Sequence, residues 1–392
     1  MNLLQDKQVA IVGGGPGGLT LARLLQLNGA VVKVYERDLS PEVRIQGSTL
    51  DLHVDSGLKA LEKAGLMNAF KENYRPGADL LMVTDQYANV VYDQHEEVYE
   101  EAFGEAHFRP EIDRGPLRRI LLASLEKETV VWNKYLISLS ENEGGWLLQF
   151  KDGTVASADL VIGADGANSK IRKFVTDSTP VYSGVTMVEG TVYEAAKNAP
   201  LLWELTKGGK VFALGNHRTL ITSAKGDGSL SFYTGCKKEE SWAKNSGIDF
   251  NDHHQLLNWF REEYAGWDVI WEELFNNIHT HFILRPQYYM PLDQTWVTRP
   301  NITIIGDAAH VMPPYAGEGV NMAMKDALEL CECLTSEIFP DLRSALKHYE
   351  QQMLARASAV TQMTLTSTAM LHADDSISNL LKMFSSEEEG GE

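Results

Sequence analysis

Two patterns of apolar and polar positions divide this chain into regions with different predicted sheets. Short, nearly continuous apolar runs are typical of buried parallel strands, and they occur at 9–12, 31–35, 160–162 and 302–305. From about residue 182 apolar and polar residues alternate instead. This alternation predicts one antiparallel sheet with an exposed face, whose strands lie at 185–193, 210–212, 219–224 and 230–235. Two more strands are predicted at 80–91, around a turn at 86–89.

Helical spacing of apolar residues fills the gaps between these strands. It predicts helices at 19–27, 114–125, 253–264, 321–334 and 342–384, the last one interrupted near 372–375. Residues 130–159 have the pattern of a small antiparallel meander. Because an apolar strand of the first kind returns only at 302–305, the parallel sheet is predicted to be discontinuous in sequence.

A glycine-rich segment, Gly13-Gly-Gly15-Pro-Gly-Gly18, lies between the first predicted strand and the first predicted helix. Its glycines allow a tight turn, a close approach of the backbone to a pyrophosphate, and close packing of helix on strand. The second strand ends in Glu36, at the distance from the turn where a carboxylate accepts hydrogen bonds from a ribose diol. A carboxylate there disfavours a 2′-phosphate, so this site suits FAD or NAD and not NADP.

Two further segments combine glycine with an acid after a buried strand. Gly163-Ala-Asp165-Gly166 is predicted to lead into a helix, and Gly306-Asp307-Ala-Ala-His310 leads through more glycines to Gly319 and Asn321. Asp307 is placed to accept a ribityl hydroxyl, and the helix start after it offers N–H donors to a flavin carbonyl. Either segment alone is equally consistent with an ordinary strand–turn–helix. All three segments in this order predict an FAD site, with His310 supporting its turn.

The fold class that follows is α/β with an α+β substrate domain. We expect a Rossmann-like, discontinuous FAD-binding domain over 1–180 and 295–340, and an inserted, mainly antiparallel substrate-binding sheet domain over 181–294. A C-terminal helical segment over 341–384 and a disordered tail over 385–392 complete the expected organisation.

Composition argues against several classes of partner. The 392 residues carry 35 basic and 54 acidic side chains, and the resulting net charge of −19 argues against nucleic acid and anionic membranes. The three cysteines, Cys236, Cys331 and Cys333, give no metal-ligand spacing and no disulfide framework, so we expect buried packing residues and no metal. No signal-peptide or membrane-helix pattern occurs. We expect a cytoplasmic monomer.

The chain resembles the class A flavin monooxygenases, the family of para-hydroxybenzoate hydroxylase, over essentially its whole length. The three segments above match that family's dinucleotide fingerprint, its D-x-x-x-G-A-D-G-x-x-S-x-x-R segment and its G-D-A-A-H-x-x-x-P-x-x-G-x-G-x-N segment. Other phrases are similar to the tetracycline-inactivating flavin monooxygenases; they lie at Arg44–His53, Lys170–Asp177 and Tyr349–Met353.

The resemblance implies a noncovalent FAD reduced by transient NADPH, without a separate nicotinamide domain. The cofactor-binding residues that it implies are Gly13, Gly15, Gly18, Glu36, Arg37, Asp51, Arg118, Asp307, Gly319 and Asn321. Arg44 is the residue implied to meet NADPH; a solvated loop arginine is the alternative. For Arg118, whose neighbour is Arg119, the alternative is a charge on a helix surface.

The implied substrate-binding residues differ from those of the tetracycline-inactivating enzymes. Their substrate-binding glutamine, arginine and histidine fall on Glu189, Lys210 and Ser231 here, and Pro314 completes the implied substrate set. Glu189 turns an amide into an acceptor-only anion, Lys210 loses the planar fork of arginine, and Ser231 is much shorter. These differences count against tetracycline itself but not against a polar, polyketide-like aromatic. Each of the three is equally well explained as an exposed strand residue.

The expected activity is therefore an FAD-dependent, NAD(P)H-consuming monooxygenase that hydroxylates an aromatic or enolic polyketide-like molecule with O2, with a tetracycline as one candidate. The flavin C4a position carries the oxygen chemistry, so no catalytic side chain is assigned. The alternatives are a flavoprotein that acts on an unrelated small phenol, and a flavin-containing binding protein with little turnover.

Overall fold

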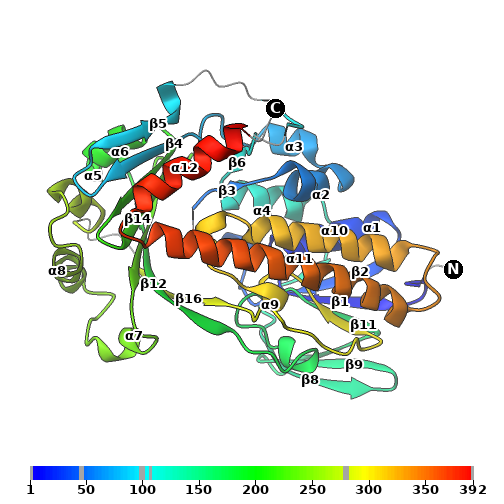
Figure 1. Cartoon of the computed structure of the whole chain (residues 1–392). Coiled ribbons are helices and arrows are strands. Elements are labelled where there is room, and N and C mark those ends of the chain that lie inside the picture. Colours follow the sequence, from blue (N-terminus) through cyan, green and yellow to red (C-terminus); the bar gives the residue numbers. More distant parts are fainter. Residues whose placement is uncertain (1–2, 44–47, 97–101, 106–107, 277–281, 390–392) are drawn as a thin grey trace.

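The first sheet is parallel and has five strands in the computed structural model, which describes residues 3–43, 48–96, 102–105, 108–276 and 282–389 (Figure 1). Its strand order is β17 (Ile302–Ile304), β11 (Leu160–Gly163), β1 (Gln8–Val12), β2 (Val31–Tyr35) and β7 (Val130–Val131). The four predicted apolar runs are therefore confirmed as parallel strands. Val12 pairs with both Tyr35 and Gly163, so the carboxyl ends of three strands lie at one edge.

Helices and a small antiparallel sheet cover this parallel sheet. α1 (Pro16–Leu27) packs closely against α10 (Gly319–Thr335), and in Figure 1 α10 lies on one side of β1 and β11, with the β8–β9 hairpin on the other. The antiparallel order is β10 (Val155–Ala158), β9 (Gly145–Phe150) and β8 (Leu136–Asn142). The predicted meander is confirmed for these strands. Its expected first residues, Val130–Val131, instead pair in parallel with β2.

The second large sheet has seven strands. Its order is β16 (Ile283–Tyr289), β12 (Val181–Val192), β15 (Leu230–Lys237), β14 (Arg218–Ala224), β13 (Lys210–Gly215), β4 (Leu81–Asp85) and β5 (Val90–Asp93). Every neighbouring pair is antiparallel except β13 with β4. The hairpin β4–β5 thus joins this sheet by pairing with its β13 edge, although the expected domain boundaries assign residues 81–93 to the 1–180 unit.

The expected exposed face of the seven-stranded sheet is wrong. Its outer face is buried under α5 (Ala195–Asn198), α6 (Pro200–Thr206), α8 (His253–Glu263) and the turn η5 (Val269–Leu274). The alternating polar residues that suggested exposure, such as Ser223 and Ser231, lie on the inner face and are themselves buried. Alternation here reflects a polar interior face and not contact with bulk solvent.

A two-stranded sheet, short helical turns and further helices complete the described elements. They are β3 (Leu50–Asp51), which pairs with β6 (Glu111–Ile112), the turns η1 (Pro41–Val43), η2 (Val54–Leu58), η3 (Gln94–Glu96), η4 (Arg172–Phe174) and η6 (Pro314–Ala316), and the helices α2 (Lys59–Lys63), α3 (Met67–Lys71), α4 (Arg114–Ala123), α7 (Trp242–Asn245) and α9 (Asp307–His310). The helix expected after Gly166 is only the short turn η4. The Asp165 carboxylate accepts hydrogen bonds from Ser169 and Lys170 and so holds the backbone in a turn.

Two helices form the C-terminal segment. α11 (Leu342–Leu371) is separated from α12 (Ser376–Glu389) by the predicted interruption, which is confirmed. α12 continues to Glu389 and so extends into the range 385–392 that was expected to be a disordered tail. The run of glutamates there is composed of good helix formers. Within the described residues no helix is long and apolar enough to cross a membrane.

Candidate active site

Gly13, Gly15 and Gly18 shape the turn from β1 into α1, and each makes a different contact possible. Gly13 has a φ of 113°, and a Cβ atom on it would lie 2.1 Å from the carbonyl oxygen of Ala164. A Cβ on Gly18 would lie 2.2 Å from the Gly13 carbonyl oxygen, so this glycine lets the helix approach the strand. A Cβ on Gly15 would meet no described atom within 4 Å, and no described side chain caps α1. The N–H groups that begin α1 are therefore accessible to an anion.

Glu36 is buried at the end of β2 and fastens this turn. One carboxylate oxygen accepts a hydrogen bond from the Gly14 N–H at 2.5 Å, and the other accepts one from the Asp38 N–H at 2.9 Å. Carboxylate oxygens have further lone pairs, so the expected contact of Glu36 with a ribose diol stays a prediction. Its demonstrated role is to set the shape of the glycine turn.

Arg118 extends from α4 toward the same region. Its Nη2 donates to Asp38 Oδ2 at 3.0 Å, and its guanidinium carbon lies 5.4 Å from the ring centre of Trp132. The Nε and Nη1 atoms are buried and have no hydrogen-bond partner among the described residues. Two unmatched buried donors are costly unless a ligand accepts from them, which supports an anion at this point. Arg37, by contrast, has an exposed side chain.

The loop around Asp307 is held by Arg172, a residue that the sequence analysis did not assign to the site. The buried Arg172 guanidinium donates to the backbone carbonyls of Asp307 and Ala308 at 2.8 Å and to that of Ala167 at 2.9 Å. Gly306 precedes the loop with a φ of 59°, in a region that favours glycine. The shape of the loop thus depends on backbone contacts, and the Asp307 side chain is left accessible to solvent.

The Asp307 carboxylate is surrounded by protein and yet accessible. Desolvation by that protein raises its pKa, an effect that His310, Arg114 and Arg172 partly oppose. No described residue donates a hydrogen bond to the carboxylate. This combination fits an acceptor that faces a cavity and serves a ligand hydroxyl.

His310 supports the same loop from behind. Its Nε2 lies 2.6 Å from Asp326 Oδ2, and that oxygen also accepts the Gly306 N–H at 2.8 Å. Arg356, on α11, donates to the other oxygen of Asp326 at 2.7 Å. Burial opposes ionisation of Asp326, but His310 and Arg356 outweigh it and lower its pKa. The loop after β17 is therefore anchored to both α10 and α11, as expected for a structural His310.

Asn321 and Gly319 begin α10 on the opposite side of the site. The Asn321 side chain is fully buried: its amide oxygen accepts the His53 N–H at 3.0 Å and its amide nitrogen donates to the Asp51 carbonyl at 3.0 Å. A Cβ on Gly319 would meet no described atom within 4 Å, and no described side chain caps α10. The N-terminus of a second helix is thus accessible beside Asp51.

Three predicted substrate residues lie on the inner face of the seven-stranded sheet. Side chains two residues apart on a strand share a face, and cross-strand partners share it too. Lys210 pairs with Ser223, which pairs with Ser231, and one row further Glu189 pairs with Tyr233. The sequence therefore identified residues that do meet on one face.

Contacts show that this face looks toward the predicted cofactor loops. The Tyr233 hydroxyl accepts a hydrogen bond from the Ser48 N–H at 2.8 Å, close in sequence to Asp51. Thr219, on the same face, lies with its hydroxyl 3.3 Å from that of Tyr315, in the turn η6 that precedes α10. The two sets of predicted residues thus face one shared space.

The individual substrate residues have distinct surroundings. Lys210 forms an ion pair with the fully buried Glu111, and Glu189 forms one with the partly exposed Arg285. The Ser231 hydroxyl is buried and has no hydrogen-bond partner among the described residues. Pro314 begins η6 and is exposed. Arg44, implied to meet NADPH, lies outside the described residues.

Comparison with known proteins decides the family. A model described as "FAD binding domain" matches residues 6–246 and 294–364, which is most of the chain. The chain belongs to the family of FAD-dependent monooxygenases. The gap in the match, 247–293, covers α8, η5 and β16, which complete the outer layer and one edge of the seven-stranded sheet.

Relatives of this flavoprotein agree with the assignment. "Monooxygenase asqM" of Emericella nidulans is 28% identical over 92% of this chain and 94% of its own length. A Klebsiella pneumoniae HpxO structure, complexed with FAD and uric acid, has a TM-score of 0.77 at 20% identity and covers 99% of this chain and 94% of that one. The tetracycline destructase Tet(51) has a TM-score of 0.73 at 17% identity, covering 97% and 96%. These two structural likenesses show a shared fold.

The residues present fit an FAD molecule. Accessible N–H groups at the starts of α1 and α10 suit a pyrophosphate and a flavin carbonyl, and the unmatched donors of Arg118 suit an anion between them. Asp307 offers a free carboxylate at a helix start. Individual contacts with the cofactor remain predictions for Glu36, Arg37 and Asp51.

Sequence reasoning missed the partners that position the predicted residues. Arg172, Glu111 and Arg285 contact loops or strands far away in sequence, so no local pattern identifies their roles. Arg172 alone carried a usable signal, because it is the last residue of the matched D-x-x-x-G-A-D-G-x-x-S-x-x-R segment.

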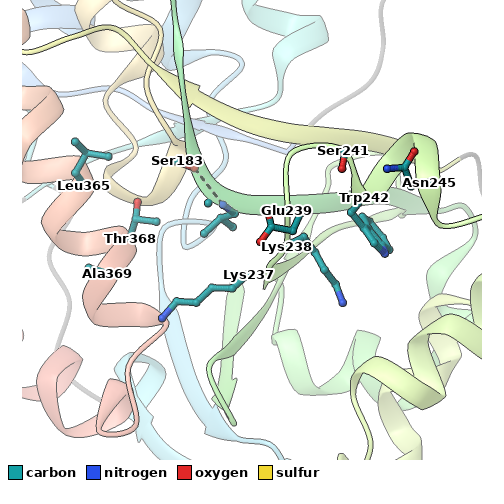
Figure 2. A pocket seen from close by; sticks show the side chains of 12 residues that line it. Ser183, Lys237, Lys238, Glu239, Ser241, Trp242, Asn245, Leu365, Thr368 and Ala369 are labelled. Atoms are coloured by element: carbon teal, nitrogen blue, oxygen red, sulfur yellow. Dashed lines mark hydrogen bonds between the residues drawn. The ribbon is translucent and has the colours of Figure 1, made fainter.

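A separate pocket of about 870 Å³ lies between α11, α7 and the ends of β12 and β15, and none of the predicted site residues lines it (Figure 2). Its two lysines have structural partners: Lys237 donates to the His372 carbonyl at 3.0 Å at the end of α11, and Lys238 is paired with Glu263. The two positive charges in this pocket are therefore explained without a ligand.

Proposed function

We propose that this flavoprotein consumes NAD(P)H and inserts one oxygen atom from O2 into an aromatic or enolic, polyketide-like small molecule, with a tetracycline as one candidate. The observation that carries the proposal is the inner sheet face, where Lys210, Ser231 and Glu189 lie opposite the loops of Asp307 and α10. A bound flavin supplies hydride acceptance from a nicotinamide and activation of O2.

The inner face supports a substrate that is both planar and polar. Phe212 and Ile221 form a cross-strand pair in the row of Tyr233 and Glu189, so apolar and aromatic groups stand between the charged ones. Lys210 offers a cation to an enol or phenol oxygen, and Glu189, paired with Arg285, offers an acceptor to a hydroxyl or amide N–H. The buried Ser231 hydroxyl has a hydrogen bond still to make.

The protein's own task in such a reaction is positioning and exclusion of water. α1, α10 and the Arg172-held loop would fix the cofactor, and the sheet face would fix the substrate ring against it. The helices α11 and α12 close one end of this face, where Leu214, Leu371 and Leu380 form a small buried cluster. No described side chain has to act as a nucleophile.

We further propose NADPH as the reductant, met by Arg44, and a cytoplasmic, monomeric enzyme. The guanidinium of Arg44 suits a phosphate dianion. The three cysteines are all free and buried, which suits a reducing compartment.

A substrate screen tests the proposal. FAD-loaded protein is mixed with NADPH and, in parallel, NADH, in the presence of tetracyclines, polyketide phenols and small phenols. We expect reductant consumption to rise sharply with some members of the panel, and the product to gain the mass of one oxygen atom. A flavin-loaded protein that no compound stimulates would favour a binding role.

A further inference from the structure

Glu111 is a buried carboxylate that the proposed function leaves without a role. It lies on the two-residue strand β6, and its side chain has no exposed surface. Directly across the strand pair stands Asp51, so two carboxylates share one face of a two-stranded sheet. Like charges in this arrangement are destabilising unless a cation or a proton intervenes. Lys210 is the cation: its ammonium group reaches Glu111 from β13 of the other sheet.

Lys210 connects this buried pair with the substrate face. Its side chain is 22% exposed while that of Glu111 is closed to solvent, so Lys210 is the member of the ion pair that reaches the surface of the sheet. In its cross-strand row Lys210 is followed by Ser223 and Ser231, the row that also contains a predicted substrate residue. A substrate oxygen that contacts Lys210 is therefore separated from Glu111 only by the Lys210 ammonium group.

Many charged groups surround the pair, and they set how easily it takes up a proton. Asp51 faces Glu111 across the strands, and His53 Nε2 lies 2.9 Å from Asp51 Oδ2 and its Nδ1 lies 3.6 Å from Glu318. Arg75 directs its guanidinium to the carbonyls of Ala224 and Gly208. Asp79 lies near Lys210, and Arg109 lies near Asp51. Asp113 accepts a hydrogen bond from the Gly226 N–H, and Arg114 donates one to the Ser48 carbonyl.

Burial and these neighbouring charges together determine whether Glu111 carries a proton at neutral pH. Burial raises the pKa of Glu111 to about 7, with Asp51 acting in the same direction and Lys210 against it. Burial disfavours the charge on Lys210, but Glu111 and Asp51 outweigh it and raise its pKa. Lys210 therefore stays protonated while Glu111 changes its charge near neutrality.

We propose that Glu111, acting through Lys210, receives the proton of a substrate enol or phenol hydroxyl, so that the substrate is held as an oxyanion beside the Lys210 ammonium group. This inference rests on the proposed function. It makes Lys210 the group that touches the substrate and Glu111 the residue that acts through it.

The proton transfer balances without any other reactant. Lys210 gives one ammonium proton to the Glu111 carboxylate, and the neutral amine that results takes the proton of the substrate hydroxyl. At the end Glu111 is a neutral carboxylic acid, Lys210 is again an ammonium group, and the negative charge has moved from Glu111 to the substrate oxygen. An electron-rich oxyanion is the form of such a ring that attacks an electrophilic oxygen most readily. The relay therefore activates the substrate as well as binding it.

Two variants distinguish this relay from a merely structural ion pair. Glu111→Gln keeps the shape of the side chain but removes the acceptor. Lys210→Arg keeps the charge and the ion pair, yet an arginine does not give up its proton in proteins, so the relay is broken. Glu350→Gln is the matched control, because Glu350 is another buried glutamate with a raised pKa, and its carboxylate accepts hydrogen bonds from Thr298 and Thr303 and forms no ion pair with Lys210.

The first measurement needs no substrate. Infrared difference spectra of the FAD-loaded protein, recorded during a pH titration, report the C=O band of a protonated carboxylic acid. We expect a band with a midpoint near pH 7 that is present in the wild type and in Glu350→Gln and missing in Glu111→Gln. If the wild type shows no such band, or Glu111→Gln keeps it, the inference is overturned whatever the substrate is.

The second measurement uses the compound that gives the strongest stimulation in the screen. The wild-type rate should rise with pH through about 7, and both Glu111→Gln and Lys210→Arg should be slower by roughly 100-fold at pH 7, the scale of general acid–base catalysis. The deficit should shrink as the pH approaches the compound's own pKa, because the substrate then arrives ionised. If both variants keep the wild-type rate and pH profile, the relay is excluded. If no compound stimulates the wild type, the proposed function fails. The infrared titration then still shows whether Glu111 takes up a proton near neutral pH.

Discussion

Asn321 and Asp51 are joined by a hydrogen bond of 3.0 Å, from the side-chain amide of the first turn of α10 to the backbone carbonyl of β3, 270 residues earlier in the chain. The amide oxygen of Asn321 also accepts the His53 N–H at 3.0 Å and the Ser56 hydroxyl at 3.1 Å. One fully buried side chain thus fixes how the start of α10 sits against the segment that carries Asp51.

Replacing Asn321 by aspartate tests this joint. The variant loses the N–H donor and places a carboxylate oxygen against the Asp51 carbonyl, so we expect the free energy of unfolding to fall by about 1–3 kcal/mol. FAD affinity should fall as well, since the accessible helix start shifts. Thermal unfolding and flavin titration measure both quantities. Wild-type stability together with wild-type flavin affinity would show that the joint is dispensable.

Asp307→Ala tests whether its carboxylate accepts a cofactor hydroxyl. Because Arg172 holds this loop through backbone carbonyls, the truncation should leave the fold intact while it weakens FAD binding by about 1–3 kcal/mol. The free flavin concentration at half-saturation is the readout. Asp341→Ala, which removes an exposed cap of α11 far from the loop, is the control and should bind FAD normally. Unchanged affinity in a folded Asp307→Ala would mean that the aspartate serves only the turn.

Asp326→Asn should lower the free energy of unfolding much more than Glu329→Gln, a substitution at a nearby residue of α10. Asp326 is fully buried and accepts from His310, Gly306 and Arg356, and loss of its charge leaves buried donors without a partner. We expect a loss of about 3–5 kcal/mol in the free energy of unfolding, and a lower flavin content because the Gly306 loop is released. Glu329 pairs with the same arginine at a partly exposed position, so its change should cost under about 1 kcal/mol. Equal effects in denaturant titrations would contradict the anchoring role.

The pH dependence of stability should reveal the raised pKa of Glu111. Its pKa is raised from 4.5 to about 7 in the folded protein, so the folded state holds a proton that the unfolded state has already released in that window. The stability that this proton contributes is fully present below pH 4.5 and is lost as the pH rises through about 7. A shift of this size corresponds to about 3–4 kcal/mol at most. The difference between wild type and Glu111→Gln in unfolding free energy should therefore change across this window, whereas a constant difference would refute the shift.

Kinetics of two alanine variants should separate the cofactor and substrate surfaces. Arg44→Ala removes the cation expected to meet NADPH, so the KM for NADPH should rise while FAD content stays unchanged. Lys210→Ala should instead depress substrate-stimulated turnover and spare the KM for NADPH, because Lys210 belongs to the inner sheet face. Steady-state assays on both variants provide the comparison. The same kinetic defect in both would show that the proposed division is wrong.

Local patterns predicted much of this fold because its strands and turns have local causes. The apolar runs of β1, β2 and β11 and the glycines at Gly13 and Gly18 have requirements that can be read within a few residues. The polar inner face was misjudged because alternation does not tell whether polar residues meet solvent or an internal cavity. Ser231 is the clearest case, since it alternates like a surface residue and is buried.

Sequence patterns did not predict the contacts that site residues make with residues far away in the chain. Arg172 holds the Asp307 carbonyl from 135 residues away. The pKa of Glu111 is raised because the folded chain buries its carboxyl group and places Asp51 across from it on β3, and Lys210, which arrives from another sheet, only partly opposes this rise. Such contacts depend on the closed fold. The sequence named Lys210 as a substrate residue but gave no indication of the carboxylate behind it.

The proposed monooxygenase activity is tested by turnover of the purified, FAD-loaded protein with a stimulating aromatic or enolic compound under isotopically labelled oxygen gas. Acid precipitation of the same sample should release the flavin, as expected for a noncovalent cofactor. We expect each reductant molecule consumed in the coupled reaction to yield one product molecule that carries one labelled oxygen atom. Product that carries its new oxygen only from water, or reductant oxidation that no compound accelerates, would contradict it.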